Sequence, residues 1–337
     1  MELLGMSVAL LAMFVGFGAV IGVLFGFFGM GGSFLVTPAL LVMGYPTRVA
    51  VGSGLAFVFG TSVIGALRHR SLGQVDYKLA ALMTLSVTAG IEVGKNSVLA
   101  LEALGLADAV VSVAYVGLLG VVGAFVVYDS WVSGSGDESD DADDADDEKA
   151  DGLFTGIHLP PMVSLTGGPT VSVWVIFAVG LVVGVLAGFL GVGGGFLLMP
   201  AMMYGFGVPA AVAVGTDILQ ITVSGGVGSF LYAQSGGVDL SIVVPLLAGS
   251  ALGARLGSAA TKLVDEDGIK GYFGLMLLGG AVAVGLRQVG TATGIDFLNT
   301  ASFVLIVGSA LFVSGAIALQ SVRAMRTRDG GAAVSTR

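Results

Sequence analysis

The residues whose chemistry is easiest to recognise lie in two glycine-rich stretches of otherwise apolar sequence. They are Gly29, Gly31, Gly32 and Ser33 in the first stretch, and Gly191, Gly193, Gly194 and Gly195 in the second. Glycines allow positive φ angles and a close approach of the backbone to a ligand. A helix that begins at Ser33 or at Gly195 would present unpaired N–H groups and the positive end of its dipole, which together bind anions. We therefore predict that both stretches bind a small anionic substrate, although the glycines could instead serve only tight helix packing.

Polar side chains inside the neighbouring apolar segments are the next candidates, because they are costly in a membrane and tend to line transport pathways. The substrate-binding candidates are Ser53, Thr216 and Gln220. The amide of Gln220 could hydrogen-bond an oxyanion without repelling it. Asp217 is the most unusual, since a carboxylate there could take up a proton or coordinate Na⁺ and so couple transport to an ion gradient. Alternatively, Asp217 could cap a helix at the membrane interface.

Two charged residues stand at equivalent positions of two similar segments. Glu92 occurs in GIEVG and Arg255 occurs in GARLG. They could form an ion pair, and Arg255 could attract an anion; alternatively, both could extend to the lipid headgroups from helix ends. The two histidines, His69 and His158, lie outside the apolar segments, and the chain has no cysteine. The sequence therefore predicts no metal site and no cofactor.

Long apolar segments must position these residues. The chain of 337 residues is 55% hydrophobic and 11% charged. Many of its apolar segments are long enough to cross a hydrocarbon core of about 30 Å. The segments are 7–29, 33–44, 49–67, 77–99 and 109–128, then 171–191, 195–206, 210–232, 239–260, 270–288 and 300–320. We predict an all-α polytopic membrane protein with five segments in each half, one of them a short broken helix, and one extra C-terminal span.

The two halves are related in sequence. GFFGMGGSFLVTPAL at 26–40 returns as GFLGVGGGFLLMPAM at 188–202, with nine of the fifteen positions identical. AVGS at 50–53 likewise matches AVGT at 213–216. Internal repeats of this kind are typical of secondary transporters, whose two halves form a site at their interface. If the short segments cross the membrane, most basic flanks fall on the cytoplasmic side, which favours inverted over parallel repeats.

Domain boundaries follow from this pattern. We predict a first transmembrane repeat over 1–130, an acidic linker over 131–170, a second repeat over 171–290, an extra span over 291–322 and a basic tail over 323–337. The linker holds ten acidic residues and one lysine between Ser133 and Asp151, so we expect it to be disordered and solvated. The positive-inside rule places the linker and the C-terminus in the cytoplasm. The excess of aspartate and the low pI indicate a halophile.

The two glycine-rich segments, with their downstream matches, resemble the paired signatures of the TauE/SafE sulfite-exporter family, also called TSUP. The resemblance covers residues 7–290. It implies a multi-pass transporter of the cell membrane that moves small sulfur-containing anions, such as sulfite, thiosulfate or organosulfonates, usually outward. The acidic linker, Ser33 where the second copy has Gly195, and the extra span depart from the pattern. The identity of the anion does not carry over.

Other classes of protein lack the residues that they need. The sequence contains no GxxxxGK[ST] loop for ATP-driven transport, and neither HExxH nor GxSG for an intramembrane enzyme. It predicts no nucleic-acid partner and no particular oligomeric state. The leading interpretation is a secondary carrier coupled to a proton or Na⁺ gradient across the lipid bilayer. The alternative is a passive anion channel on the same frame, which would need polar rings along a pore.

Overall fold

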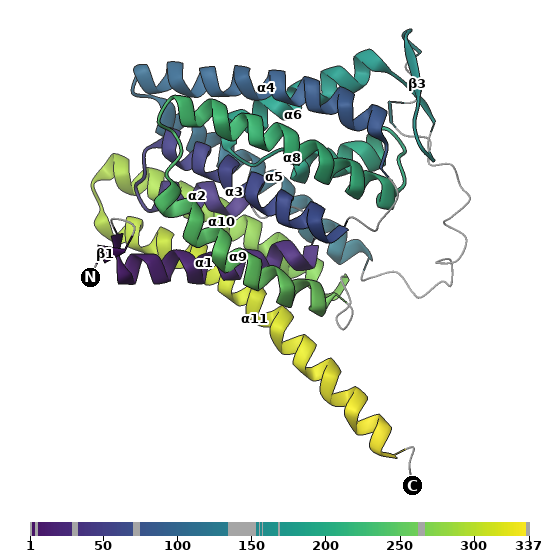
Figure 1. Cartoon of the computed structure of the whole chain (residues 1–337). Coiled ribbons are helices and arrows are strands. Elements are labelled where there is room, and N and C mark those ends of the chain that lie inside the picture. Colours follow the sequence, from purple (N-terminus) through teal and green to yellow (C-terminus); the bar gives the residue numbers. More distant parts are fainter. Residues whose placement is uncertain are drawn as a thin grey trace. The chain divides into compact units, whose positions relative to one another are not determined.

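The computed structural model describes residues 2–3, 6–28, 33–69, 75–133, 153–154, 156, 158–167, 169–261 and 267–334. Eleven α-helices run through these residues (Figure 1): α1 (Val8–Phe28), α2 (Ser33–Val42), α3 (Thr47–His69), α4 (Tyr77–Ala103), α5 (Ala107–Ser133), α6 (Val173–Leu190), α7 (Gly195–Pro200), α8 (Ala210–Gln234), α9 (Leu240–Ala260), α10 (Asp267–Thr293) and α11 (Asp296–Val334). One π-helical turn, η1 (Ala201–Gly205), follows α7. Two short antiparallel hairpins pair β1 (Glu2–Leu3) with β2 (Met6–Ser7), and β3 (Met162–Ser164) with β4 (Thr170–Ser172).

Most of the helices suit a membrane. Within the described residues, seven are long and apolar enough to cross one: α1, α3, α5, α6, α9, α10 and α11. The predicted all-α polytopic fold is therefore confirmed. The helices α4 and α8 have 27 and 25 residues, and they carry the polar side chains on which the functional argument depends.

Contacts divide the chain into two units. Unit 1 comprises Met1–Tyr45, Ser112–Gly136 and Val244–Arg337, and unit 2 comprises Pro46–Val111 and Asp137–Val243. Unit 1 thus holds α1, α2, most of α5, most of α9, and the whole of α10 and α11. Unit 2 holds α3, α4, α6, α7, η1 and α8. Each unit combines helices from both halves of the sequence, so the units do not coincide with the predicted repeats.

In unit 2, α4 and α6 lie side by side (Figure 1) along a seam of glycines. Every fourth residue of α6 from Gly180 to Gly188 faces α4, and a Cβ atom at Gly184 would lie 2.7 Å from the Cα atom of Val87. Gly90 and Gly94 of α4 are equally close to the backbone of α6. Because lipid supplies no hydrophobic force between helices, this close approach is what packing in a membrane requires.

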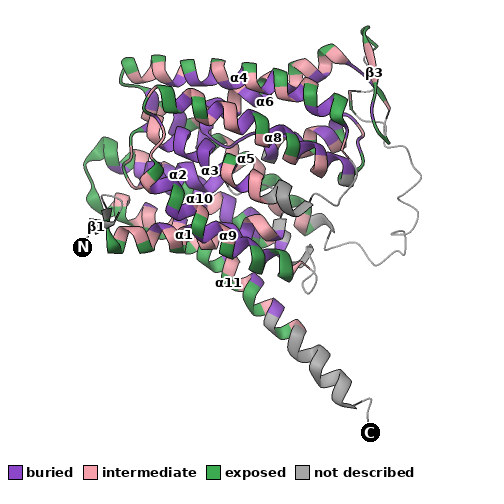
Figure 2. Ribbon diagram, viewed as in Figure 1, coloured by how far each residue is buried: buried purple, intermediate pink, exposed green. Residues whose placement is uncertain are grey.

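Unit 1 repeats this arrangement with α1 and α9. A Cβ atom at Gly22 of α1 would lie 2.7 Å from the Cα atom of Ser250, and Gly253 of α9 meets the backbone of Ala19 in the same way. The hydroxyl of Ser314 on α11 donates a hydrogen bond to the carbonyl of Val20 at 3.3 Å. In unit 2, α3 is buried without interruption from Ala50 to Val58, and Figure 2 colours the helices by burial.

The segment predicted to be an acidic linker falls into two parts. Its acidic run lies largely outside the described residues. Its C-terminal part is structured, because the backbone N–H groups of Leu153 and Phe154 donate hydrogen bonds to the carbonyls of Tyr204 and Gly205 at 3.0 Å each, and β3 follows. The end of the linker is therefore attached to the π-helical turn η1 in unit 2.

Candidate functional site

The second glycine-rich stretch breaks the helical path as the sequence predicts. Helix α6 ends at Leu190, and Gly191 follows with a φ of 76° and donates its N–H to the carbonyl of Ala187 at 2.7 Å. Gly193 and Gly194 also have positive φ, at 73° and 86°, before α7 begins at Gly195. Residues with a side chain rarely adopt these angles, so the three glycines are required by the turn itself.

Close neighbours also require glycine at two positions of the stretch, Gly193 and Gly195. A Cβ atom at Gly193 would collide with Val58 of α3. A Cβ atom at Gly195 would lie 2.7 Å from Oδ2 of Asp217 and would also collide with Ile221. The start of α7 therefore presses against the carboxylate of α8. By contrast, Gly188 at the head of the stretch packs against the backbone of Ile91, so the stretch serves both helix packing and the turn.

The helix that follows the turn is irregular. Pro200 closes α7, and η1 then forms a π-helical turn up to Gly205. Proline removes a backbone donor, and single π-helical turns occur frequently at functional sites. Tyr232, which the sequence analysis did not single out, is fully buried on α8 and donates its hydroxyl to the carbonyl of Gly188 at 2.6 Å. This bond ties the last turn of α6 to α8 beside the break.

The first glycine-rich stretch is described only in part. Gly29, Gly31 and Gly32 lie outside the described residues. Helix α2 begins at Ser33 and contains Pro38 without interruption to Val42. This first stretch thus has the expected short helix in unit 1, and the anion-binding role of its glycines remains a prediction.

Asp217 and Gln220 are buried on α8, with 5% and 1% of their surfaces exposed. Among the described residues, Oδ1 of Asp217 and Oε1 of Gln220 have no hydrogen-bond partner. Nε2 of Gln220 donates to Oγ of Ser224 at 2.7 Å. A buried polar atom without a partner is costly, so two of them on one helix face indicate a site that is completed by something else.

Ser53 and Thr216, both predicted to bind substrate, hold the backbone in two matching contacts. The N–H of Asp239, just before α9, donates to Oγ of Ser53 at 3.1 Å. The N–H of Asp76, just before α4, donates to Oγ1 of Thr216 at the same distance. Both hydroxyls are fully buried. In this structure Ser53 of α3 therefore anchors the start of α9, and Thr216 of α8 anchors the start of α4.

Asp76 is the N-cap of α4 and is almost fully buried. Its Oδ1 accepts hydrogen bonds from the N–H groups of Lys78 and Leu79 at 3.0 and 2.9 Å, and its Oδ2 accepts one from Thr166 at 2.7 Å. Burial on its own would raise the pKa of this carboxyl group, but the hydrogen bonds from Leu79, Thr166 and Lys78 together outweigh it and lower the pKa below the ordinary value.

The two charged candidates lie in different surroundings. Glu92 pairs with Lys95 on its own helix, with 3.1 Å between Oε1 and Nζ, and its Oε1 also accepts a hydrogen bond from Asn96. Arg255 is exposed on α9. The described part of the chain holds no group of three or more His, Cys, Asp or Glu side chains that could bind a metal ion.

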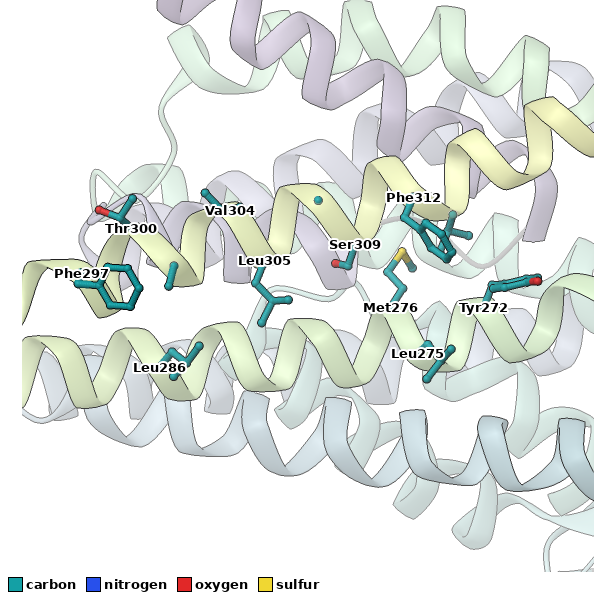
Figure 3. Close-up of a pocket in the computed structure, with 13 residues that line it drawn as sticks. Tyr272, Leu275, Met276, Leu286, Phe297, Thr300, Val304, Leu305, Ser309 and Phe312 are labelled. Carbon is teal, nitrogen blue, oxygen red and sulfur yellow. The ribbon is translucent and has the colours of Figure 1, made fainter.

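A large groove in unit 1 has a different character. About 720 Å³ in volume, it lies between α10 and α11 (Figure 3). Its lining is mainly apolar, as Leu286, Val304 and Phe312 show, and its polar members are Tyr272, Thr300 and Ser309. A binding site for a small anion needs several N–H or cationic donors close together, and this lining does not offer them. The buried polar site of unit 2 is therefore the better candidate.

Comparisons with known proteins agree with the architecture. The profile of the family described as Sulfite exporter TauE/SafE matches residues 14–284. A probable membrane transporter protein of Xylella fastidiosa is 26% identical over 284 residues, which cover 83% of this chain and 96% of the relative. The probable membrane transporter protein YjnA of Bacillus subtilis is 26% identical over 269 residues, with 75% and 89% covered. No solved structure matches significantly. With its paired glycine-rich stretches, its multiple spans and this match over most of its length, the chain belongs to the TauE/SafE sulfite-exporter family and is a multi-pass membrane transporter.

Proposed function

We propose that this protein is a secondary transporter that exports small sulfur-containing anions, such as sulfite, thiosulfate or organosulfonates, together with a coupling cation. The observation that carries the proposal is the position of Asp217. This carboxylate is buried in unit 2 and lies against Gly195, where the broken helix restarts, and its Oδ1 has no hydrogen-bond partner among the described residues. Family membership supports the substrate class, because the matching profile is named for sulfite export.

The geometry supports coupling through charge. The N–H groups at the start of α7 are the donors proposed for the anion. An ionised Asp217 beside Gly195 repels an anion, and this repulsion is strong where water is excluded. A proton or Na⁺ on Asp217 removes it. Cation and anion therefore bind together and move in the same direction.

The direction of transport then depends on the net charge that moves. A doubly charged anion that travels with one cation still carries one negative charge outward. A membrane potential that is negative inside favours this movement by about 2.3 kcal/mol per 100 mV. Export of a doubly charged anion is therefore compatible with a cation that accompanies it, because the electrical term opposes the unfavourable cation gradient. A singly charged organosulfonate with one cation carries no net charge and gains nothing from the membrane potential.

The proposal is tested by flux into proteoliposomes. The purified full-length chain is reconstituted, and uptake of labelled sulfite, thiosulfate and a small alkylsulfonate is compared with uptake of acetate under an imposed inward proton or Na⁺ gradient. We expect the sulfur anions to accumulate above their external concentration. Empty vesicles are the control. Flux that only ever runs downhill, whichever cation gradient is imposed, would instead identify a passive channel.

A further inference from the structure

The buried face of α8 carries two oxygen atoms, three residues apart, that have no partner in the described part of the chain. These are Oδ1 of Asp217 and Oε1 of Gln220, on side chains that are at least nine-tenths buried. Residues three apart on a helix are neighbours on its surface, with their Cβ atoms about 5–6 Å apart. We infer that Asp217 and Gln220 form a Na⁺ site in unit 2, so that Gln220 binds the coupling cation and not the substrate anion. This inference rests on the proposed function for the role of the site in transport.

While Asp217 is ionised, both unpartnered atoms can only accept. A carboxylate oxygen and an amide oxygen attract a cation or a donor and repel an anion. One of the two N–H groups on Nε2 of Gln220 donates to Oγ of Ser224, so the atom of Gln220 that lacks any partner among the described residues is its oxygen. That oxygen is a suitable ligand for a metal ion.

No positive side chain neutralises Asp217 in the described part of unit 2. The two ion pairs found there join Arg48 to Glu102 and Lys95 to Glu92. An unpaired charge in a buried position is strongly unfavourable. A bound monovalent cation balances one carboxylate, and unlike a proton carried on Asp217 alone it coordinates the oxygen of Gln220 directly.

The surroundings fit Na⁺ better than a divalent ion. Calcium and magnesium sites gather several carboxylates or keep several waters, whereas no cluster of three acidic or other metal-binding side chains occurs among the described residues. Asp217 also lies against the Gly191–Gly195 break. Unwound backbone at such breaks supplies carbonyl oxygens to Na⁺ in transporters that are built from repeats.

The test is a direct measurement of Na⁺ binding without any anion transport. Binding of ²²Na⁺ to the purified full-length protein in detergent is measured at constant ionic strength, with choline as the replacement ion and no sulfur anion present. We expect saturable binding that unlabelled Na⁺ displaces better than K⁺. Asp217→Asn and Gln220→Met should each weaken it at least tenfold, since each removes one oxygen ligand or its charge.

Two variants separate coordination from general damage. Gln220→Glu keeps an acceptor oxygen, so it should retain Na⁺ binding. If Gln220 instead bound the substrate anion, the parent should bind the anion and Gln220→Glu should lose this binding. Thr222→Val is the matched control, because among the described residues the Thr222 hydroxyl bonds only to the carbonyl of Ile218 on its own helix. It should bind Na⁺ as the parent does. Size-exclusion profiles show which variants fold. If Gln220→Met does not fold, the comparison of the parent with Asp217→Asn is decisive.

The outcomes distinguish this inference from the proposed function. Absent ²²Na⁺ binding, or equal binding in the parent, Asp217→Asn and Gln220→Met, would overturn the Na⁺ site. Sulfite accumulation driven by a proton gradient in Na⁺-free vesicles would at the same time leave the transporter proposal intact. Conversely, Na⁺ binding that depends on both residues without any movement of sulfur anions would support the site and contradict the proposed substrate.

Discussion

At the scale of single residues, Asp217 and Gln220 of α8 carry the proposed coupling, because both are buried and each has an oxygen atom without a hydrogen-bond partner among the described residues. Both are also visible in the sequence, since polar side chains in an apolar helix are costly. The hydrogen bonds of Ser53 and Thr216 to backbone N–H groups far along the chain could not be predicted, because such contacts depend on packing between distant segments. Tyr232 carried no sequence signal beyond its type, since an aromatic residue in an apolar helix is ordinarily part of the core.

Asp76 makes a prediction about pH at this scale. Its folded pKa lies below the ordinary value, so the unfolded chain binds this proton more readily. Its contribution is fully present above about pH 4, the ordinary range of an aspartate, and is lost as pH falls through the lower folded pKa. In Asp76→Asn, which keeps a capping oxygen but loses the charge, we expect a stability lower by about 0.3–2 kcal/mol at pH 7, the range for a negative charge at a helix N-terminus.

The measurement for Asp76 is the thermal unfolding midpoint in detergent from pH 7 down to the acid limit of the protein. The gap between the parent and Asp76→Asn should narrow only at the acid end. Asp129→Asn is the control, because Asp129 lies on α5 away from any helix start. A gap that stays constant at all pH values would show that the charge of Asp76 contributes nothing.

At the scale of helices, length and hydropathy were sufficient to predict every long helix. A segment that crosses a membrane must form its backbone hydrogen bonds internally, so a long apolar segment is expected to be helical. The partners of those helices were not predictable. Glycines every four residues mark a packing face, yet they do not say which helix packs against it. Close glycine contacts pair α1 with α9 in unit 1 and α6 with α4 in unit 2, so that each unit draws on both halves of the sequence.

The glycine seam gives a matched comparison within one helix. Gly22 of α1 meets the backbone of Ser250, whereas a Cβ atom at Gly16 would have no neighbour within 4 Å. Gly22→Ala should therefore destabilise unit 1 by about 1–3 kcal/mol through overpacking. Gly16→Ala should be neutral or slightly stabilising, since alanine is the better helix former. The measurement is the thermal midpoint of each variant in the same detergent. Equal midpoints would contradict the seam.

At the scale of the whole molecule, the sequence predicts inverted repeats with the acidic linker and the C-terminus in the cytoplasm. The prediction rests on the distribution of basic residues, which is a statistical tendency, and on counting the short helices α2 and α7 as crossings. Hydropathy could not decide this, because a segment of 10 or 6 residues is too short for a complete span. The match to the TauE/SafE family supports the transport role without fixing the orientation.

Single cysteines test the orientation, which is convenient in a chain that has none. Leu104→Cys lies in the exposed turn between α4 and α5, and Ala142→Cys lies in the acidic run. For inverted repeats, an impermeant thiol reagent applied to intact right-side-out cells should label position 104 and spare position 142. Both should react after permeabilisation. Parallel repeats would give the opposite pattern in intact cells.

The central claim is that the buried carboxylate of α8 couples a cation to the anion. Its most direct test is sulfite accumulation in proteoliposomes by the parent protein and by Asp217→Asn, under the same imposed cation gradient. We expect the parent to concentrate sulfite. Asp217→Asn should still bind sulfite, because the N–H donors at the start of α7 remain, but it should lose gradient-driven accumulation and only equilibrate the anion. Undiminished accumulation by Asp217→Asn would contradict the account.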